Sequence, residues 1–432
     1  MVSRSLWLPL SCVLCALIVT TPSAAAQEPP SSMLELFPSR DASGTAWVPD
    51  ATTMEGVHAS AGAWRVMIHG TIFGQYIFEP GDVHRTGGFA NHQASSANWG
   101  MVMARRRAGA GRVGLRAMLS AEPWTVSDCG FIDYLANGEM CDGDTIHDRQ
   151  HPHDLFMELS ADYVRPLGRA ASLEVYGGLS GEPALGPPGY PHRLSASVNP
   201  FAPIGHHWID STHVTFGLVT AGVFTARYKM EGSLFNGREP DDRRADLDLG
   251  PLDSFSGRFT FAPGPRVTWQ VSAAHLHEAE AQFPPAPRTD IDRVSASATI
   301  VARGGTWATT AAYGANAGWI LLTEGSVRRV SHAFLLESTI GAGGRNTWFG
   351  RLELVGKPGH DLHDHAHPAQ VLPTGKLQGG YARDLRIPGV FTLGIGGTAA
   401  MSVIPQELIP RYGGRVAPSV GVFVVLRPRH RM

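Results

Sequence analysis

The chain has 432 residues, and its 36 Lys and Arg against 38 Asp and Glu give a formal net charge of −2. Such a balance provides no strongly basic face, so nucleic acid is not expected as a partner. Apolar residues make up 43% of the chain, and beyond the N-terminus no apolar run is long enough for a transmembrane helix. These figures argue against a helical membrane protein. A β-barrel, which spreads its apolar residues over every second position, has an average composition of this kind.

The first residues contain the three parts of a secretory signal peptide. Arg4 supplies the positive charge, residues 6–19 form the apolar core, and Ala24, Ala25 and Ala26 offer a small-residue cleavage site. We expect residues 1–26 to be removed on export. The alternative, a permanent anchor helix, requires a longer apolar stretch.

Of the four cysteines, Cys12 and Cys15 lie within the expected signal peptide. The mature chain then keeps Cys129 and Cys141, both in one polar loop. Because two cysteines in a short exported loop tend to be oxidised, we predict a disulfide that closes this loop. The alternative, a thiolate metal site, is disfavoured in an oxidising compartment.

Residues 27–62 contain Pro and Ser pairs and show little periodicity. We interpret them as a periplasmic N-terminal segment. The alternative for part of this segment is a plug that folds into the domain that follows.

From about residue 64 to residue 426, stretches of alternating apolar and polar residues are joined by a tight turn, then a long polar loop, in strict alternation. In the clearest stretch, residues 64–78, most even positions are apolar or aromatic, so one face of an extended strand is apolar. Sixteen stretches can be counted, within a range of 14–18. The rhythm predicts an all-β fold, a single antiparallel transmembrane barrel over residues 63–432. Tight links are expected near residues 107–111, 166–168, 220–222, 263–265, 304–305, 341–345 and 385–388.

A soluble β-sandwich is the alternative fold, and the polar face of the strands decides between the two. The two inner faces of a sandwich form a dry core, whereas here charged residues recur on the face opposite the apolar one. Charges are costly in a dry core but suit a wet lumen. The predicted pore-lining residues are Arg65, Arg116, Glu158, Asp162, Glu174, Arg227, Lys229, Glu231, Arg258, Glu337, Arg351, Glu353 and Lys376.

The signal peptide, the strand rhythm and the alternation of turns and loops resemble those of bacterial outer-membrane porin-like barrels, over nearly all of the mature chain. The resemblance implies the outer membrane of a Gram-negative bacterium, with periplasmic turns and extracellular loops. Its implied partners are outer-membrane lipid, the barrel-assembly machinery and, as one form of assembly, a homotrimer. One departure is the C-terminus, which continues past Phe423 to a basic tail ending at Met432 instead of ending on an aromatic residue.

Histidine suggests a more specific role. The densest group lies in residues 360–367, where imidazole and carboxylate groups offer several ligands to a Zn, Cu or Ni ion. A second group lies in residues 147–154. For residues 360–367 the alternative is a solvated polar loop, and for residues 147–154 it is a lining of the pore mouth that hydrogen-bonds to neighbouring loops. The candidate metal ligands are His360, Asp361, His363, Asp364, His365, His367, His147, His151 and His153.

A third histidine group lies in the long loop that ends near residue 213. Long loops of wide barrels can fold inward and occupy the lumen. We therefore regard His206, His207, Asp210 and His213 as candidates for a constriction.

An enzymatic barrel would need a Ser hydroxyl activated by a nearby His. Ser331 and His332 supply the residue types, but neighbours in a strand point to opposite faces. Ser272 and His275 supply them too, without the fingerprint of an outer-membrane phospholipase. We therefore predict no enzymatic activity, and a lipid hydrolase is the disfavoured alternative.

The sequence thus predicts a channel for passive diffusion of small solutes or ions, linked to transition-metal handling through its His-rich loops and requiring no cofactor. The near balance of charge in the predicted lumen argues against strong ion selectivity. The main alternative is a non-conducting barrel whose extracellular loops bind a metal or a partner.

Overall fold

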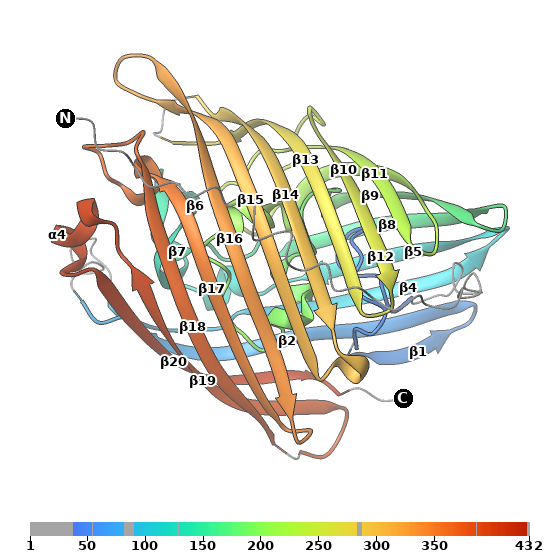
Figure 1. Ribbon diagram of the computed structural model, residues 1–432. Coiled ribbons are helices and arrows are strands. Elements are labelled where there is room, and N and C mark those ends of the chain that lie inside the picture. The colour runs from blue at the N-terminus through green and yellow to red at the C-terminus, as the bar shows by residue number, and fades with distance from the viewer. Residues whose placement is uncertain are drawn as a thin grey trace.

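A computed structural model gives the structure of residues 38–53, 55–81, 90–127, 129–282, 287–385 and 387–429. Over these ranges the chain forms one closed barrel of 16 antiparallel strands, tilted around a common axis (Figure 1). The predicted fold class and strand number are confirmed.

The barrel closes where the last strand pairs with the first, with Ile72 opposite Leu426 and Phe78 opposite Val420. Around the barrel the strands are β2 (Trp64–Phe78), β4 (Asn98–Ala108), β5 (Gly111–Leu119), β8 (Phe156–Leu167), β9 (Ala171–Gly181), β10 (Thr215–Phe224), β11 (Tyr228–Phe235), β12 (Ser254–Gly264), β13 (Val267–Glu280), β14 (Thr289–Val301), β15 (Trp307–Leu321), β16 (Ser326–Ala342), β17 (Asn346–Pro358), β18 (Val371–Leu385), β19 (Phe391–Val403) and β20 (Val416–Pro428).

Two short strands complete the wall beside β2. β1 (Val57–Ala61) pairs with the first residues of β2, on the side that β20 occupies further along. β3 (His92–Ser95) pairs with the last residues of β2, on the side that β4 occupies. Both ends of the long strand β2 are therefore paired.

The outward face of the strands is apolar, as the alternation requires. On β2, Ile68, Ile72 and Tyr76 are 47–51% exposed, whereas Met67 and Ile77 point inward and are buried. Exposed aliphatic and aromatic side chains recur on the other strands. An outward apolar surface of this kind is compatible with a lipid bilayer.

Aromatic side chains gather where the strands meet the short turns. Tyr163, Tyr228, Trp307, Trp348 and Phe391 lie within five residues of this end of their strands and are 38–57% exposed. Aromatic girdles in outer-membrane barrels lie at the boundary between the hydrocarbon core and the headgroups. The short-turn end therefore has the surface expected at a membrane interface.

Two details of the predicted chain path are wrong. Residues 220–222 lie inside β10, and the tight turn follows at residues 225–227. Glycine at position 222 allows β10 and β11 to approach closely. A Cβ there would lie only 2.8 Å from the Cβ of Glu231 on β11. In addition, the connection at residues 322–325 is short although it lies at the long-loop end, so the alternation of short and long connections is not strict.

The helices of the described chain are short and lie between strands. They are α2 (Glu122–Thr125), η4 (Tyr190–His192), η5 (Leu194–Ala196), α3 (His206–Ile209), η6 (Ser211–His213), η7 (Arg303–Gly305), η8 (Gly359–Leu362), η9 (Gln406–Leu408) and α4 (Ile409–Tyr412). Within the described ranges, no helix is long and apolar enough to cross a membrane.

The remaining strands, β6 (Phe131–Cys141) and β7 (Asp144–Gln150), form a separate hairpin in the connection between β5 and β8. In Figure 1 this hairpin is seen behind β16 and β17, within the outline of the barrel. Its side chains are largely buried. The hairpin is thus part of the barrel's interior rather than of its wall.

Candidate functional site in the barrel lumen

The inner face of the barrel carries a dense set of charged side chains. Lys229 on β11 is typical, with its Nζ 2.6 Å from Glu174 and 3.4 Å from Glu231. Because buried charges are stable only when paired, this wall is organised as a network of ion pairs. Of the predicted pore-lining residues, those buried on the inner face are Arg116, Glu158, Asp162, Glu174, Lys229, Glu231, Arg258, Glu337, Arg351, Glu353 and Lys376.

Two predicted pore-lining residues lie elsewhere. Arg227 is exposed in the turn between β10 and β11, because that turn comes later than expected. Arg65 is exposed near the start of β2, where it contacts Ser60. Conversely, sequence reasoning missed Arg105 and Arg112, which are buried on the inner face of β4 and β5.

The N-terminal segment runs inside the barrel and binds these charges. Arg105 and Arg112 both donate to the Asp41 carboxylate, at 2.8 and 3.2 Å. Arg116 donates to the backbone carbonyl of Gly44 at 2.7 Å. Burial acts to raise the pKa of Asp41, but these guanidinium groups outweigh it and hold the pKa well below its usual range.

The next residues of the segment are held in the same way. Thr45 donates its hydroxyl to Glu231 at 2.5 Å, accepts a hydrogen bond from Arg258 at 3.1 Å, and its carbonyl contacts Lys229. Residues 42–49 are buried. Part of residues 27–62 thus occupies the lumen, as a plug would. Residues 1–37 lie outside the described chain, so the signal peptide stays a prediction.

The β6–β7 hairpin is a second segment inside the barrel. Lys376 on β18 forms an ion pair with Asp133, and Lys357 on β17 bonds to Asn137. Leu135 is fully buried. Charged groups of the wall are again used to fix an inserted segment.

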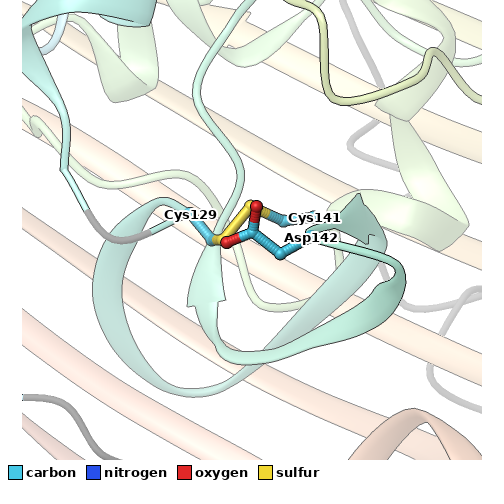
Figure 2. Close-up of side chains that lie close together, drawn as sticks. All are labelled: Cys129, Cys141 and Asp142. Atoms are coloured by element: carbon cyan, nitrogen blue, oxygen red, sulfur yellow. A yellow bond between two sulfur atoms is a disulfide. The ribbon is translucent and has the colours of Figure 1, made fainter.

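A disulfide joins Cys129, which lies just before β6, to Cys141, the last residue of β6. The bond between Cys129 and Cys141 is present, as predicted, and Figure 2 shows the Asp142 carboxylate beside the sulfur atoms. These three side chains bring ligand atoms close together. Since both sulfur atoms are engaged with each other, neither is available as a thiolate ligand.

The connection between β9 and β10, residues 182–214, is the third segment inside the barrel. Trp208 donates its indole N–H to Ser331 at 2.7 Å, and the backbone N–H of Gly205 donates to Glu353 at 3.0 Å. Arg193 donates to Glu337 at 2.7 Å and also forms an ion pair with Asp210. The constriction candidates His206, His207, Asp210 and His213 all lie in this segment and are buried.

Two imidazoles of this region form a hydrogen-bonded chain. His153 Nδ1 lies 2.9 Å from Glu122, His153 Nε2 lies 2.9 Å from His213 Nε2, and His213 Nδ1 lies 2.8 Å from the carbonyl of Asp210. A carbonyl only accepts, so His213 donates from Nδ1. Burial holds the pKa of His213 well below its ordinary value and keeps the ring neutral, so its Nε2 accepts. His153 then donates from both nitrogens and is an imidazolium balanced by Glu122. Burial acts to lower the pKa of His153, but Glu122 outweighs it and raises the pKa.

His206 and His207 are each oriented by a carboxylate. His206 Nδ1 lies 2.8 Å from Asp210, and His207 Nδ1 lies 3.0 Å from Glu239. Burial lowers the pKa of His206 to about 4, which keeps its ring neutral at pH 7. Metal-binding histidines usually donate their second N–H to a carboxylate in this way. The Nε2 atoms of both rings are buried without a hydrogen-bond partner.

The described residues also bring together a group of possible metal ligands at the long-loop end of the lumen. His360 and Asp361 of η8 meet Glu280 at the end of β13, with one ligand atom of each within 4.8 Å of the others. His207 and Glu239 line the same cavity, whose volume is about 30 Å³. This is room for one ion or water. Burial acts to lower the pKa of His360, but Asp361 outweighs it and raises the pKa to about 9.

The other predicted metal ligands do not join this group in the structure. These residues were grouped because they lie close together along the chain. In the structure, each side chain instead contacts a different neighbour. The observed contacts are His147 tilted against His363, His365 beside His363, His367 with Asp364, His151 with Glu139 and His153 with Glu122.

No family model and no curated relative matches this sequence. Among solved structures, the barrel is similar to Salmonella typhi OmpF in complex with daunomycin, with a TM-score of 0.52 and 8% identity over 86% of this chain and 100% of that chain. An anion-selective porin from Comamonas acidovorans has a TM-score of 0.49 and 10% identity over 85% of this chain and 100% of that chain. For Pseudomonas putida OprB the TM-score is 0.48 and the identity 9%, over 84% and 94% of the two chains.

The chain has the fold of the outer-membrane porins. At such low identity, the likeness describes the fold of this barrel alone.

The wall of this porin-type barrel separates the Ser and His pairs considered for catalysis. Ser331 faces the lumen, whereas His332 is on the outer face, 2.8 Å from the hydroxyl of Tyr313. Ser272 is buried inside, and His275 points outward. Neither pair therefore has the geometry in which an imidazole activates the hydroxyl.

Proposed function

We propose that the protein is an outer-membrane channel that passes ions and the smallest solutes. A 16-stranded barrel is wide enough for an aqueous channel. Here residues 42–49, the β6–β7 hairpin and residues 182–214 all lie inside it. The observation that supports the proposal is this narrowing of a charged, porin-type lumen by three segments bound to its wall.

The remaining space supports passage of small species only. A cavity of about 220 Å³ lies between the N-terminal segment, the β9–β10 connection and the wall, and it is lined at the short-turn end by Gly305, Gly341 and Arg427. It extends inward to His192 and Trp99. Acidic and basic groups of the wall pair with one another, so we expect weak selectivity between anions and cations.

Flux into proteoliposomes tests this proposal. We expect the folded protein to pass potassium, chloride and glycine but to exclude a trisaccharide. Flux of the trisaccharide would contradict the narrowing. Absence of any ion flux, with folding verified by heat-modified electrophoretic mobility, would contradict the channel and favour a closed barrel that binds its ligand.

A second candidate function, capture of a divalent transition metal at the long-loop end, is favoured by the grouping of Glu280, His360 and Asp361. One imidazole and two carboxylates suit zinc or another borderline divalent ion. Calorimetric titration of the folded protein with zinc is the test, with Glu280→Gln as the variant. Asp364→Asn in the same loop is the matched control.

We expect the Glu280→Gln variant to lose at least tenfold in affinity for zinc, and the control to bind as the unmodified protein does. Equal binding by the Glu280→Gln variant would contradict the assignment of this site. It would leave the channel proposal untouched.

A further inference from the structure

A group of methionines faces the lumen, where the wall is otherwise mainly polar. These side chains are 1–3% exposed and pack together, with Trp99 against them. By contrast, Met230 and Met401 face outward and are 68% and 50% exposed. The methionine cluster, carried by the adjacent strands β2, β4, β5 and β8, consists of Met67, Met101, Met103, Met118 and Met157.

The strand register places a histidine in the same row as these thioethers. His69 on β2 stands opposite Met101 on β4, and Met101 stands opposite Met118 on β5. Side chains directly opposite each other in antiparallel strands have Cβ atoms about 4.5–5.5 Å apart. His69 is 7% exposed, and its Nε2 is buried without a hydrogen-bond partner.

A second imidazole reaches the cluster from the inserted β9–β10 connection. His192 Nε2 lies 3.4 Å from the sulfur of Met118. An ion bound by a nitrogen at about 2.0 Å and a sulfur at about 2.3 Å, the bond lengths found for zinc, holds the two atoms at roughly this separation. The ring of His192 lies 4.8 Å from that of Trp99 and 5.9 Å from that of His69, centroid to centroid.

The surroundings allow a cation to reach these ligands. His69, Trp99 and His192 line the 220 Å³ cavity that opens toward the short-turn end. Arg116 on β5 stands opposite Met103, and its positive charge is matched by Glu158 at 3.7 Å and Asp162 at 3.6 Å. The face of Trp99 can also stabilise a cation through its π system.

The chemistry of these groups selects the ion. Leucine would fill the same space, so packing alone does not call for five thioethers. Methionine can serve as a flexible filler of gaps, but here the thioethers adjoin two imidazoles and an indole at the inner end of a cavity. Thioether sulfur is a soft ligand that prefers Cu(I) over zinc or magnesium.

We propose that the methionine cluster, with His69 and His192, is a binding site for a soft monovalent cation, Cu(I) or Ag(I). This goes beyond the proposed channel and does not depend on it, because a site in the wall binds whether or not ions cross the barrel. It is also distinct from the carboxylate and histidine group at the long-loop end, which favours divalent ions.

Silver binding to the folded, detergent-solubilised protein tests the proposal. The full chain is incubated with Ag(I) in chloride-free buffer containing excess zinc, which occupies the harder sites, and bound silver is counted after desalting. The variant is Met101→Leu with Met118→Leu, which conserves side-chain volume. The control, Met230→Leu with Met401→Leu, removes two thioethers from the outer face.

We expect the lumen variant to bind one silver equivalent fewer than the control. Absorption spectroscopy at the copper edge of the Cu(I)-loaded protein should show sulfur ligands, and these should disappear in the lumen variant. Equal silver binding by the two variants, no silver bound by the unmodified protein, or a ligand shell without sulfur would each overturn the proposal. The presence or absence of sulfur ligands around Cu(I) in the unmodified protein tests the proposal even if the variant does not fold.

Discussion

Arg193 shows how a single residue fixes an inserted segment to the barrel wall. Its guanidinium joins Asp210, in its own segment, to Glu337 on β16, and all three side chains are buried. The nearby His206 is in turn oriented by Asp210. One cation shared by two carboxylates is therefore among the contacts that fix the β9–β10 connection to the wall.

Replacement of Arg193 by Met should release this segment. The buried Asp210 carboxylate would lose its guanidinium partner, while Glu337 would keep Arg351 at 3.1 Å. Breaking a buried ion pair costs about 3–5 kcal/mol. Amide hydrogen exchange over residues 190–213, measured by mass spectrometry, should accelerate. Arg243→Met is the control, because Arg243 pairs with Asp241 at an exposed position. Unchanged exchange in the Arg193→Met variant would show that the network does not hold the segment.

Acidification should weaken the docking of the same segment. Burial lowers the pKa of His206 to about 4 and that of His192 to about 3, below the ordinary value of 6.5. The undocked segment therefore takes up protons first, and docking stability falls as the pH drops from about 6.5 toward 4. The fluorescence of Trp208, obtained as the difference from a Trp208→Phe variant, should report the transition.

A His206→Gln variant tests the assignment of this pH dependence. Because one titrating ring is removed, the transition should become shallower by about one proton. A pH profile identical to that of the unmodified protein would mean that other groups control docking.

At the scale of elements, the barrel wall and the inserted segments have different origins. The wall follows from a local pattern, since strand β2 has the predicted bounds of residues 64–78 and its alternation alone sets which side chains face outward. The inserted segments depend on contacts that no local pattern records. Asp133 and Lys376, for example, are 243 residues apart in the chain.

This difference explains what the sequence could and could not predict. The strand number, the inward charges and the disulfide follow from periodicity, charge and compartment. The metal-ligand group required Glu280, which stands at the end of a strand far from the His-rich loop. The methionine cluster was missed because apolar residues at inward positions look like ordinary packing until the strand register is known.

The disulfide between Cys129 and Cys141 should make the β6–β7 hairpin more rigid. It should not determine where the hairpin lies in the lumen. Cys129 and Cys141 are separated by 12 residues, and closing a loop of about 15 residues contributes roughly 3 kcal/mol in the chain-entropy model. After reduction, protease should cut at the exposed turn near residues 141–145, whereas the ion pair of Asp133 with Lys376 should keep the rest of the hairpin inside. Resistance to protease under reducing conditions would contradict this role.

At the scale of the whole molecule, the barrel combines an apolar outer surface with a lumen in which three segments are bound by the wall. Charged residues that would line an open channel instead pair with one another and with these segments. Assembly as a homotrimer and insertion by the barrel-assembly machinery remain predictions. We therefore expect the inserted segments, rather than the barrel wall, to set the size of the passage.

Single-channel conductance in a planar bilayer tests this claim most directly, with Asp41→Asn as the variant. Asp41 is the carboxylate that Arg105 and Arg112 hold, so its loss should free the N-terminal segment. The control is Asp50→Asn, whose partner Arg40 lies nearer the surface. We predict small, steady steps for the unmodified protein and the control, and several-fold larger steps for Asp41→Asn. Equal conductance for all three proteins would show that the N-terminal segment does not set the size of the passage.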